Sequence, residues 1–369
     1  MKLKKTILNI TLSFFSIFLV FFRIKKNRIS FVSLEHDSLE GDFLLISREL
    51  EKNEEYDIHY ELVKFEKSLS GNFRYFLECI RQLFVINTSG LVILDFNNYV
   101  VSNFKRKDVR VLQIWHSSGA IKKFGNQVDR DYEIKNYDYA TVNTPEFTDA
   151  FSKGFSVDPD NVIVTGIPKT DALFDEETLR EKAERFLGEH PSIIGRKKIL
   201  YAPTFRGRLM TEFHDCYLNL ERFSEALGDE YAVLYRLHPL VQKELTAESD
   251  RIICCNSDDL YTLMYASDML ISDYSALIID YSVFNRPMYF YTPDLDEYSE
   301  SPGLSFDYES TMPGGAKRTE DELVSAIKAE ECTEDEVIAF REKFFPYTDG
   351  KSTERVVQLI DRIMNRETI

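Results

Sequence analysis

Short apolar runs alternate with amphipathic segments along most of the chain. The apolar runs predict β-strands at 29–34, 57–65, 91–96, 109–115, 139–142 and 162–165, and again, after a break at 187–198 that contains glycine and proline, at 198–202, 232–237, 251–255, 269–272 and 288–291. Helical spacing of apolar residues predicts helices at 43–50, 72–84, 217–228, 258–267, 276–284 and 320–330. This alternation is typical of parallel, doubly wound sheets. We therefore predict two Rossmann-like α/β domains, 28–190 and 191–369, with a cleft between them.

The first 27 residues follow a different pattern. Seven basic residues precede the first acidic one, Glu35, and they flank an apolar segment at 6–22. At about 1.5 Å per residue this segment is about 25 Å long, short of the roughly 30 Å core of a bilayer. Four of its five polar residues, Thr6, Asn9, Ser13 and Ser16, share one helix face, and Thr11 is the fifth. We predict that residues 1–27 form a helix lying on an anionic cytoplasmic membrane surface; a true span is the alternative.

Amino-acid composition and net charge exclude some classes of function. The chain has 369 residues, 44% hydrophobic and 29% charged, as in an ordinary globular enzyme. Its formal net charge of −17 argues against nucleic-acid binding, which needs a basic surface. Five cysteines without a CxxC motif indicate a reducing compartment and no structural metal site.

Polar residues follow the predicted strands of the first half, where sites in open α/β sheets lie. His116 ends the 109–115 run and could accept a proton from a hydroxyl nucleophile, although a lone strand-end histidine is more often structural. Ser117, Ser118, Lys122 and Lys123 follow it, and Lys169 follows the 162–165 strand. By default the paired lysines are a solvated surface.

The second half adds groups suited to phosphate. Arg236 and His238 alternate onto one side of a strand end, and Thr204 and Arg206 follow another strand. A further strand closes on Asp273 and Ser275 before a helix that carries Asp280, and a helix N-terminus favours anions. There is no P-loop, GxGxxG or HExxH motif. The set suits transfer of a group from a diphosphate donor.

Six sequence blocks occur in an order that resembles the CDP-glycerol glycerophosphotransferase family of teichoic acid synthesis, and most of all its glycerol-phosphate primase branch. The blocks are IWHSSGAIKKFG, VTGIPKTDALF, ILYAPTFRG, YRLHP, SDMLISDYSALIIDYSVFNRPMYFYTPDLDEY and FPYTDGKSTER. The resemblance implies a GT-B fold, two essential histidines at His116 and His238, and a last helix that packs on the first domain. Ala276 replaces the serine usual after the DYS motif, and Ser117-Ser118 replaces a smaller pair.

The resemblance implies transfer of glycerol phosphate from CDP-glycerol to a hydroxyl of a polyprenyl-diphosphate-linked saccharide, with release of CMP. His116 would be the general base, while His238, Arg236 and Arg206 would hold the diphosphate. Ser275 would bind phosphate, and Asp280 would bind ribose or glycerol hydroxyls. We expect no cofactor, and the sequence leaves a Mg²⁺ requirement open. The alternatives are CDP-ribitol or a nucleotide sugar as donor, and a non-catalytic membrane-bound binding subunit, which the retained histidines and arginines disfavour.

Overall fold

A computed structural model describes residues 2–65, 68–204, 217–237 and 249–367. The chain divides into two compact units. Unit 1 comprises residues 1–117, 124–171 and 351–369, and unit 2 comprises residues 118–123 and 172–350. Each unit contains a six-stranded sheet in which every pair of neighbouring strands is parallel. The α/β class with two parallel sheets is therefore confirmed.

The sheet of unit 1 has the order β2-β1-β3-β4-β5-β6. Its strands are β1 (Lys25–Ser33), β2 (Asp57–Leu62), β3 (Ser89–Leu94), β4 (Arg110–Gln113), β5 (Tyr139–Val142) and β6 (Val162–Val164). Its helices are α1 (Lys2–Ser16), α2 (Gly41–Leu50), α3 (Leu69–Thr88), α4 (Tyr99–Phe104), α5 (Thr148–Phe155) and α14 (Ser352–Asn365). The carboxyl ends of β1, β3, β4 and β6 carry the polar residues of interest.

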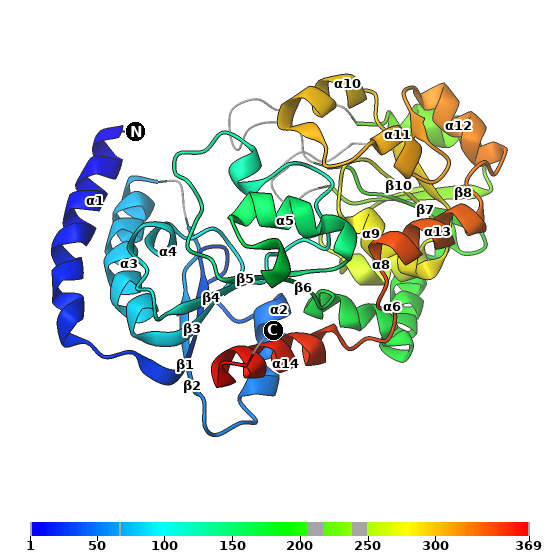
Figure 1. The fold of residues 1–369 in the computed structure, drawn as a ribbon. Helices are drawn as coiled ribbons and strands as arrows, with labels where there is room; N and C mark the ends of the chain where they lie inside the picture. The colour runs from blue at the N-terminus through cyan, green and yellow to red at the C-terminus, as the bar shows by residue number, and fades with distance from the viewer. Residues whose placement is uncertain (1, 66–67, 205–216, 238–248, 368–369) are drawn as a thin grey trace. The chain divides into compact units, whose positions relative to one another are not determined.

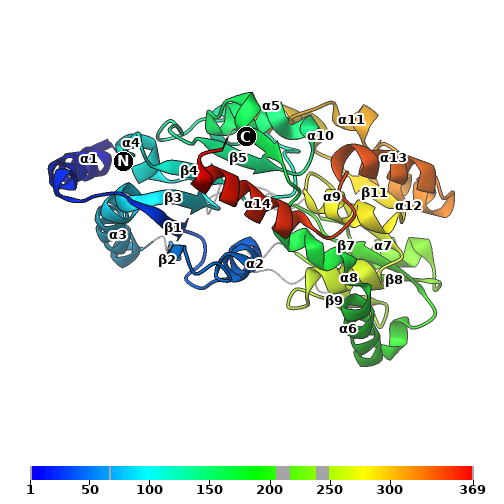
Figure 2. The same ribbon diagram turned by 60° about the horizontal axis from the view of Figure 1, so that its bottom comes forward.

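Helices cover both faces of this sheet (Figures 1 and 2). On one face α2 and α14 form a common core with β1, β3 and β4, built from residues such as Phe31, Ile46, Ile93 and Ile360. The opposite face contacts α3 and α5. The last helix thus packs on α2 and completes the core of unit 1, although almost the whole of unit 2 lies between them in the sequence.

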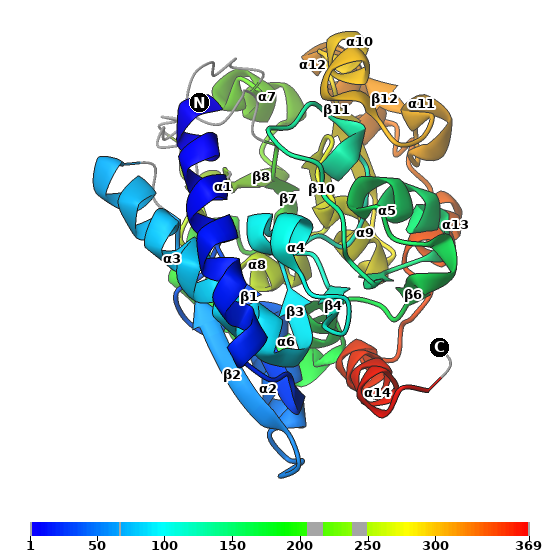
Figure 3. The same ribbon diagram turned by 60° about the vertical axis from the view of Figure 1, so that its left-hand side comes forward.

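Helix α1 and the 3₁₀ turn that follows it (Ile17–Phe21) lie along α3 and near α4 (Figure 3). Leu8, Leu12 and Leu19 are buried. Asn9 accepts a hydrogen bond from the Tyr99 hydroxyl of α4, so part of the predicted polar face contacts protein. The side of the segment turned to solvent is mainly apolar. No helix among the described residues combines the length and the hydrophobicity needed to cross a bilayer.

The sheet of unit 2 has the order β12-β11-β10-β7-β8-β9, and the reversal of this strand order between β7 and β10 is typical of a Rossmann fold. Its strands are β7 (Lys197–Tyr201), β8 (Tyr231–Tyr235), β9 (Ile252–Cys254), β10 (Met269–Ser272), β11 (Met288–Tyr291) and β12 (Ala316–Lys317). The bounds predicted for 269–272 and 288–291 match β10 and β11.

Unit 2 contains one helix that was not predicted, α6, whose residues fall within the first domain predicted at 28–190. The helices are α6 (Glu176–Glu189), α7 (Leu220–Leu227), α8 (Leu260–Ala266), α9 (Leu277–Tyr281), α10 (Leu295–Tyr298), α11 (Tyr308–Thr311), α12 (Glu320–Lys328) and α13 (Glu334–Phe344). Helix α6 buries Leu179, Ala183 and Phe186 and packs against α8. Because this apolar face belongs to unit 2, the unit begins at residue 172, earlier than the predicted boundary after 190.

Candidate functional site

A strained turn follows β4 and presents His116. Trp115 has a φ of 56°, which is a genuine outlier for a bulky side chain. The backbone N–H of Trp115 donates to Gln113 Oε1 over 2.8 Å, and the indole stacks on Phe124 at 5.3 Å between ring centroids. Strain of this kind is held only where the surroundings fix it, and it concentrates at functional sites.

The His116 ring has a defined tautomer. Its Nδ1 lies 3.1 Å from the backbone carbonyl oxygen of Asp95, at the end of β3. A carbonyl oxygen can only accept a hydrogen bond, so Nδ1 carries the proton and Nε2 keeps its lone pair. Glu35, which follows β1, brings Oε2 to 3.8 Å from the same Nδ1. The ring is therefore oriented from one side and can accept a proton through Nε2.

Two effects act in opposite directions on the pKa of His116. Desolvation lowers the pKa of His116 below its ordinary 6.5, although the Glu35 carboxylate acts to raise it. The neutral imidazole, the form that acts as a base, is therefore favoured near neutral pH. Burial also raises the pKa of Asp95 to about 7, in spite of the hydrogen bond that its Oδ2 accepts from Ser33 Oγ. Glu35, Asp95 and His116 thus lie near one another after the neighbouring strands β1, β3 and β4, and the charge of Asp42, in the first turn of α2, also acts on His116.

Lys169 connects the end of β6 with this group. Its Nζ donates to the backbone carbonyl of His116 over 2.8 Å, and its backbone N–H donates to Asp42 Oδ1 over 2.6 Å. Burial raises the pKa of the Asp42 carboxyl, although Lys169 lowers it. Lys169 thus holds the turn that carries His116, a positioning role that the sequence did not predict.

The short segment 118–123, which follows Ser117, belongs to unit 2, and the chain returns to unit 1 at Phe124. Ser117 is half-buried, whereas Ser118 is buried at 2% exposure. The backbone N–H of Lys123 donates to the Gly303 carbonyl over 3.0 Å. Lys122 forms a β-bridge with Leu304. Backbone contacts therefore hold the main chain of this segment in place, whereas the Lys123 side chain is exposed.

Two of the sequence blocks meet each other in unit 1. Asp171 accepts hydrogen bonds from the backbone N–H groups of Ser352 and Thr353, at 2.7 and 2.8 Å, and so caps α14. A side chain at Gly166, whose φ is 76°, would lie 2.4 Å from Ser352 Oγ. In the VTGIPKTD and GKSTER blocks, these residues therefore position the N-terminus of α14 against unit 1.

In unit 2 the DYS motif forms a buried junction. Asp273 is 2% exposed, and its Oδ1 accepts from the Thr204 backbone N–H over 2.8 Å. Its carbonyl accepts from the Tyr308 hydroxyl over 2.7 Å, and Tyr274 stacks on Tyr298 at 3.8 Å. Asp273 and the buried Thr204 thus shape the turns after β10 and β7.

Ser275 lies at the surface end of this junction. It is half-buried, and its Oγ accepts from the Leu277 backbone N–H over 3.4 Å. The predicted helix 276–284 forms as α9 followed by a 3₁₀ turn at Ser282–Phe284. Because α9 has only five residues, its dipole is small, and hydrogen-bond donors must dominate any anion binding there. Asp280 is buried at 6% exposure, which does not favour the predicted contact with hydroxyl groups.

Arg236 follows β8 and is half-buried. Its Nε donates to the Asp258 carbonyl over 3.2 Å. The neighbouring Leu237 backbone N–H donates to Asn256 Oδ1 over 2.8 Å. The side chain is thus held at the carboxyl edge of the sheet. Two other predicted residues, Arg206 and His238, lie outside the described part of the chain.

Sequence reasoning missed Glu35, Asp95 and Asp42. Each follows a strand or begins a helix in unit 1, so the available signal was their position at the carboxyl edge of the sheet. The proximity of Glu35 and Asp95 to His116 depends on the strand order β1-β3-β4. No local pattern encodes that order.

Two Rossmann-like units with polar groups at the strand ends are typical of a GT-B-like fold. The family model "CDP-Glycerol:Poly(glycerophosphate) glycerophosphotransferase" matches residues 13–362. The chain therefore belongs to this family and is a teichoic acid phosphotransferase.

Relatives of two kinds support this assignment. The teichoic acid ribitol-phosphate primase of Bacillus spizizenii is 33% identical over 361 residues, covering 92% of each chain. The teichoic acid glycerol-phosphate primase of Bacillus subtilis is 29% identical and covers 78% of each chain. The solved structure of the wall teichoic acid polymerase TagF has a TM-score of 0.70 at 21% identity, covering 93% of this chain and 90% of that one. The GT-B-like fold is thus confirmed.

Proposed function

We propose that the chain transfers glycerol phosphate from CDP-glycerol to a hydroxyl group of a polyprenyl-diphosphate-linked saccharide. The acceptor oxygen attacks the phosphorus that bears the glycerol, the bond from that phosphorus to the CMP oxygen breaks, and CMP leaves. The hydroxyl proton passes to His116 Nε2. The observation that carries the proposal is the His116 tautomer, fixed by the Asp95 carbonyl, within a chain of this family.

The donor contacts are assigned to unit 2. Ser275 Oγ and the backbone N–H groups after it would donate to phosphate oxygens, and Arg236 would offer its guanidinium. Arg206 and His238 would complete the set. Charge-assisted hydrogen bonds from arginine to phosphate are stronger than neutral ones. A solved structure of TagF carries the description "H444N + CDPG", which fits a CDP-linked donor in this fold.

A second donor, CDP-ribitol, is favoured by a specific observation. The ribitol-phosphate primase matches this chain with 33% identity over 92% of both chains. The glycerol-phosphate primases match with 29% and 26% identity. The acceptor-side chemistry is the same for both donors.

Release of CMP from a panel of donors tests the function. The purified chain is incubated with a lipid-linked saccharide and with CDP-glycerol, CDP-ribitol or a nucleotide sugar, and the nucleotide product is measured. We expect CMP from a CDP-polyol and a phosphodiester product. Turnover of only a nucleotide sugar, or of none of the donors by a folded chain, would contradict the proposal.

We also propose that the chain binds peripherally to the cytoplasmic face of the membrane through α1 and the turn after it. Eight of the twelve exposed large hydrophobic side chains of the described residues lie within residues 7–22, including Ile10, Phe14 and Phe21. Exposed bases follow at Arg23, Lys25 and Lys26. An apolar surface beside basic residues matches an interface of anionic lipid. This surface would bring His116 to a lipid-linked acceptor.

A further inference from the structure

Ser33 and Asp95 form a buried polar pair where β1 and β3 end. The pairing between these two strands ends at Val32 and Leu94, so Ser33 and Asp95 are the next residues of the two chains. Their side chains continue the contact, because Ser33 Oγ donates to Asp95 Oδ2 over 2.8 Å. Ser33 is 1% exposed and Asp95 is 7% exposed. A buried hydrogen-bonded pair of this kind restricts the segments around it to one arrangement.

The Asp95 carboxyl depends on the Ser33 hydroxyl. Asp95 Oδ1 is buried and has no hydrogen-bond partner among the described residues, which leaves the bond from Ser33 to Oδ2. Burial raises the pKa of Asp95 to about 7, because a buried carboxylate with one unpaired oxygen is unfavourable. Oδ2 can accept the hydrogen bond in both protonation states, since the proton can reside on Oδ1.

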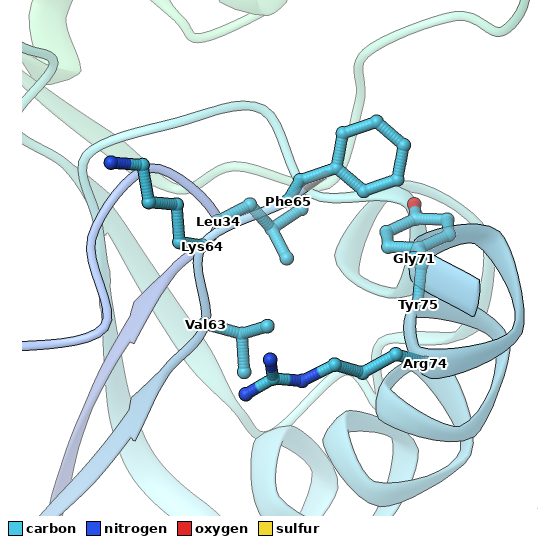
Figure 4. A pocket seen from close by; sticks show the side chains of 7 residues that line it. All are labelled: Leu34, Val63, Lys64, Phe65, Gly71, Arg74 and Tyr75. Carbon is cyan, nitrogen blue, oxygen red and sulfur yellow. The ribbon is translucent and has the colours of Figure 1, made fainter. Parts of the chain in front are cut away.

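The same hydroxyl fixes the turn that carries Glu35. Ser33 Oγ accepts hydrogen bonds from the backbone N–H of Glu35 over 3.1 Å and from that of His36 over 3.4 Å. As far as Leu34 the chain is held by the segment after β2, because the backbone N–H of Phe65 donates to the Leu34 carbonyl over 3.0 Å. Figure 4 shows Leu34 and Phe65 in the wall of a small pocket. Beyond Leu34, a serine side chain that binds the next backbone N–H groups sets the direction of the chain.

Asp95 also contacts His116, through its main chain. Strand β3 lies between β1 and β4 in the sheet. The Asp95 side chain therefore reaches Ser33 on one side, while its carbonyl accepts from His116 Nδ1 over 3.1 Å on the other. Glu35 Oε2 lies 3.8 Å from the same Nδ1. The Glu35 turn and the imidazole are thus both fastened to Asp95.

From this arrangement we infer that Ser33 and Asp95 are positioning residues for the proposed base. They hold the Glu35 carboxylate on the Nδ1 side of His116, where it stabilises the imidazolium that forms when Nε2 accepts the proton of the acceptor hydroxyl. The inference rests on the proposed function for the reaction in which the imidazolium forms. The contacts among the four residues can be tested without that reaction.

The other charged groups around His116 are held independently of Ser33. Desolvation lowers the pKa of His116, Glu35 and Asp42 act to raise it, and Lys169 acts to lower it. The backbone N–H of Lys169 donates to Asp42 over 2.6 Å, so this pair stays in place when Ser33 is changed. His36 Nε2 lies 4.0 Å from Glu35 Oε2. Because a second imidazole is close to the same carboxylate, the titration must be followed on the His116 ring itself.

NMR titration of the His116 ring in the full chain tests the inference. We expect the pKa of His116 to fall in Ser33→Ala, as in Glu35→Gln, because the carboxylate is no longer held against Nδ1. In the double variant, Ser33→Ala should add no further change, since two substitutions that act through one contact are not additive. Asp95→Asn keeps an oxygen that can accept from Ser33, so its His116 pKa should stay closer to the wild-type value than that of Asp95→Ala.

Ser30→Ala is the matched control. Ser30 is a fully buried serine of β1 whose hydroxyl forms a 2.7 Å hydrogen bond with Ser89 Oγ, so the same group is lost from the same strand. We expect Ser30→Ala to lower the melting temperature while leaving the His116 pKa at the wild-type value. Thermal unfolding verifies that each variant is folded. If Ser33→Ala does not fold, Ser33→Cys replaces the hydroxyl by a weakly bonding thiol of similar size and gives the same comparison.

The outcomes separate the inference from the proposed function. An unchanged His116 pKa in the folded Ser33 variant would overturn the inference, as would an equal fall in the wild-type and Glu35→Gln backgrounds. The acidic limb of kcat/KM for CMP release should move to lower pH together with the His116 pKa. If the pKa falls as expected but His116→Ala keeps near-normal turnover, the positioning of Glu35 by Ser33 stands and the proposed role of His116 as the base is refuted.

Discussion

Replacing Glu35 by glutamine should move the acidic limb of the pH–rate profile to lower pH. Glu35 Oε2 lies 3.8 Å from His116 Nδ1, a distance at which two unit charges interact by about 1 kcal/mol in water and about 4 kcal/mol at an effective dielectric constant of 20. The two side chains are 32% and 39% exposed, so the value lies nearer the water limit. Because the carboxylate favours the imidazolium, its loss lowers the pKa of His116 further.

The assay is kcat/KM for CMP release as a function of pH, together with an NMR titration of the His116 ring. Glu49→Gln is the control, because Glu49 is an exposed residue of α2 that pairs with Lys52; its profile should match the wild type. An acidic limb that stays in place or moves to higher pH in Glu35→Gln would refute the reasoning. It would mean that the Glu35 charge does not reach His116 in solution.

Three further predictions concern other parts of the chain. Ser275→Ala and Arg236→Ala should each raise the donor KM about tenfold or more without lowering the melting temperature; an unchanged KM would remove the donor site from this edge of unit 2. Burial and a hydrogen bond with Glu61 raise the pKa of Glu78 from 4.5 to about 7. Protonated Glu78 therefore stabilises the folded state at low pH, and this stabilisation is lost as the pH rises from 4.5 to about 7. Thermal unfolding from about pH 5 to about pH 8 should show this decline, and Glu78→Gln should reduce it; an equal decline in both proteins would contradict it. Phe14→Glu should reduce flotation with anionic vesicles, whereas Ile194→Glu, at an exposed position in unit 2, should not; equal flotation of both variants would exclude α1 as the membrane contact.

The sequence was most informative where strands are buried. The runs at 139–142, 269–272 and 288–291 coincide with β5, β10 and β11 because buried parallel strands are continuous apolar stretches. The two-residue strand β12 was missed, since Ala316–Lys317 carries no such pattern. Helix α6 was not predicted, and the boundary predicted after residue 190 placed its residues in the first domain, whereas α6 packs in unit 2.

The sequence predicted single residues of the site and did not predict which residues surround them. A histidine after an apolar strand marked His116, but the groups that set its tautomer and charge come from β1 and β3. Their approach follows from strand order, which sequence spacing does not contain. Asp273 and Asp280 are both buried, and Asp273 accepts a hydrogen bond from the Thr204 backbone; their contacts with a ligand stay predictions. Polar residues at strand ends thus indicate where a site lies more reliably than which side chains face the ligand.

In the proposed reaction, His116 takes the proton of the acceptor hydroxyl. The test is to measure kcat of the His116→Ala variant with the CDP-polyol that the wild type uses. Calorimetric titration of the variant with the same donor measures its donor affinity. A positioned general base contributes about 10²–10⁴-fold, so we predict a loss of kcat of that size with donor affinity nearly unchanged. Near-normal turnover by the folded variant would contradict the account and would make His116 a structural residue of the turn after β4.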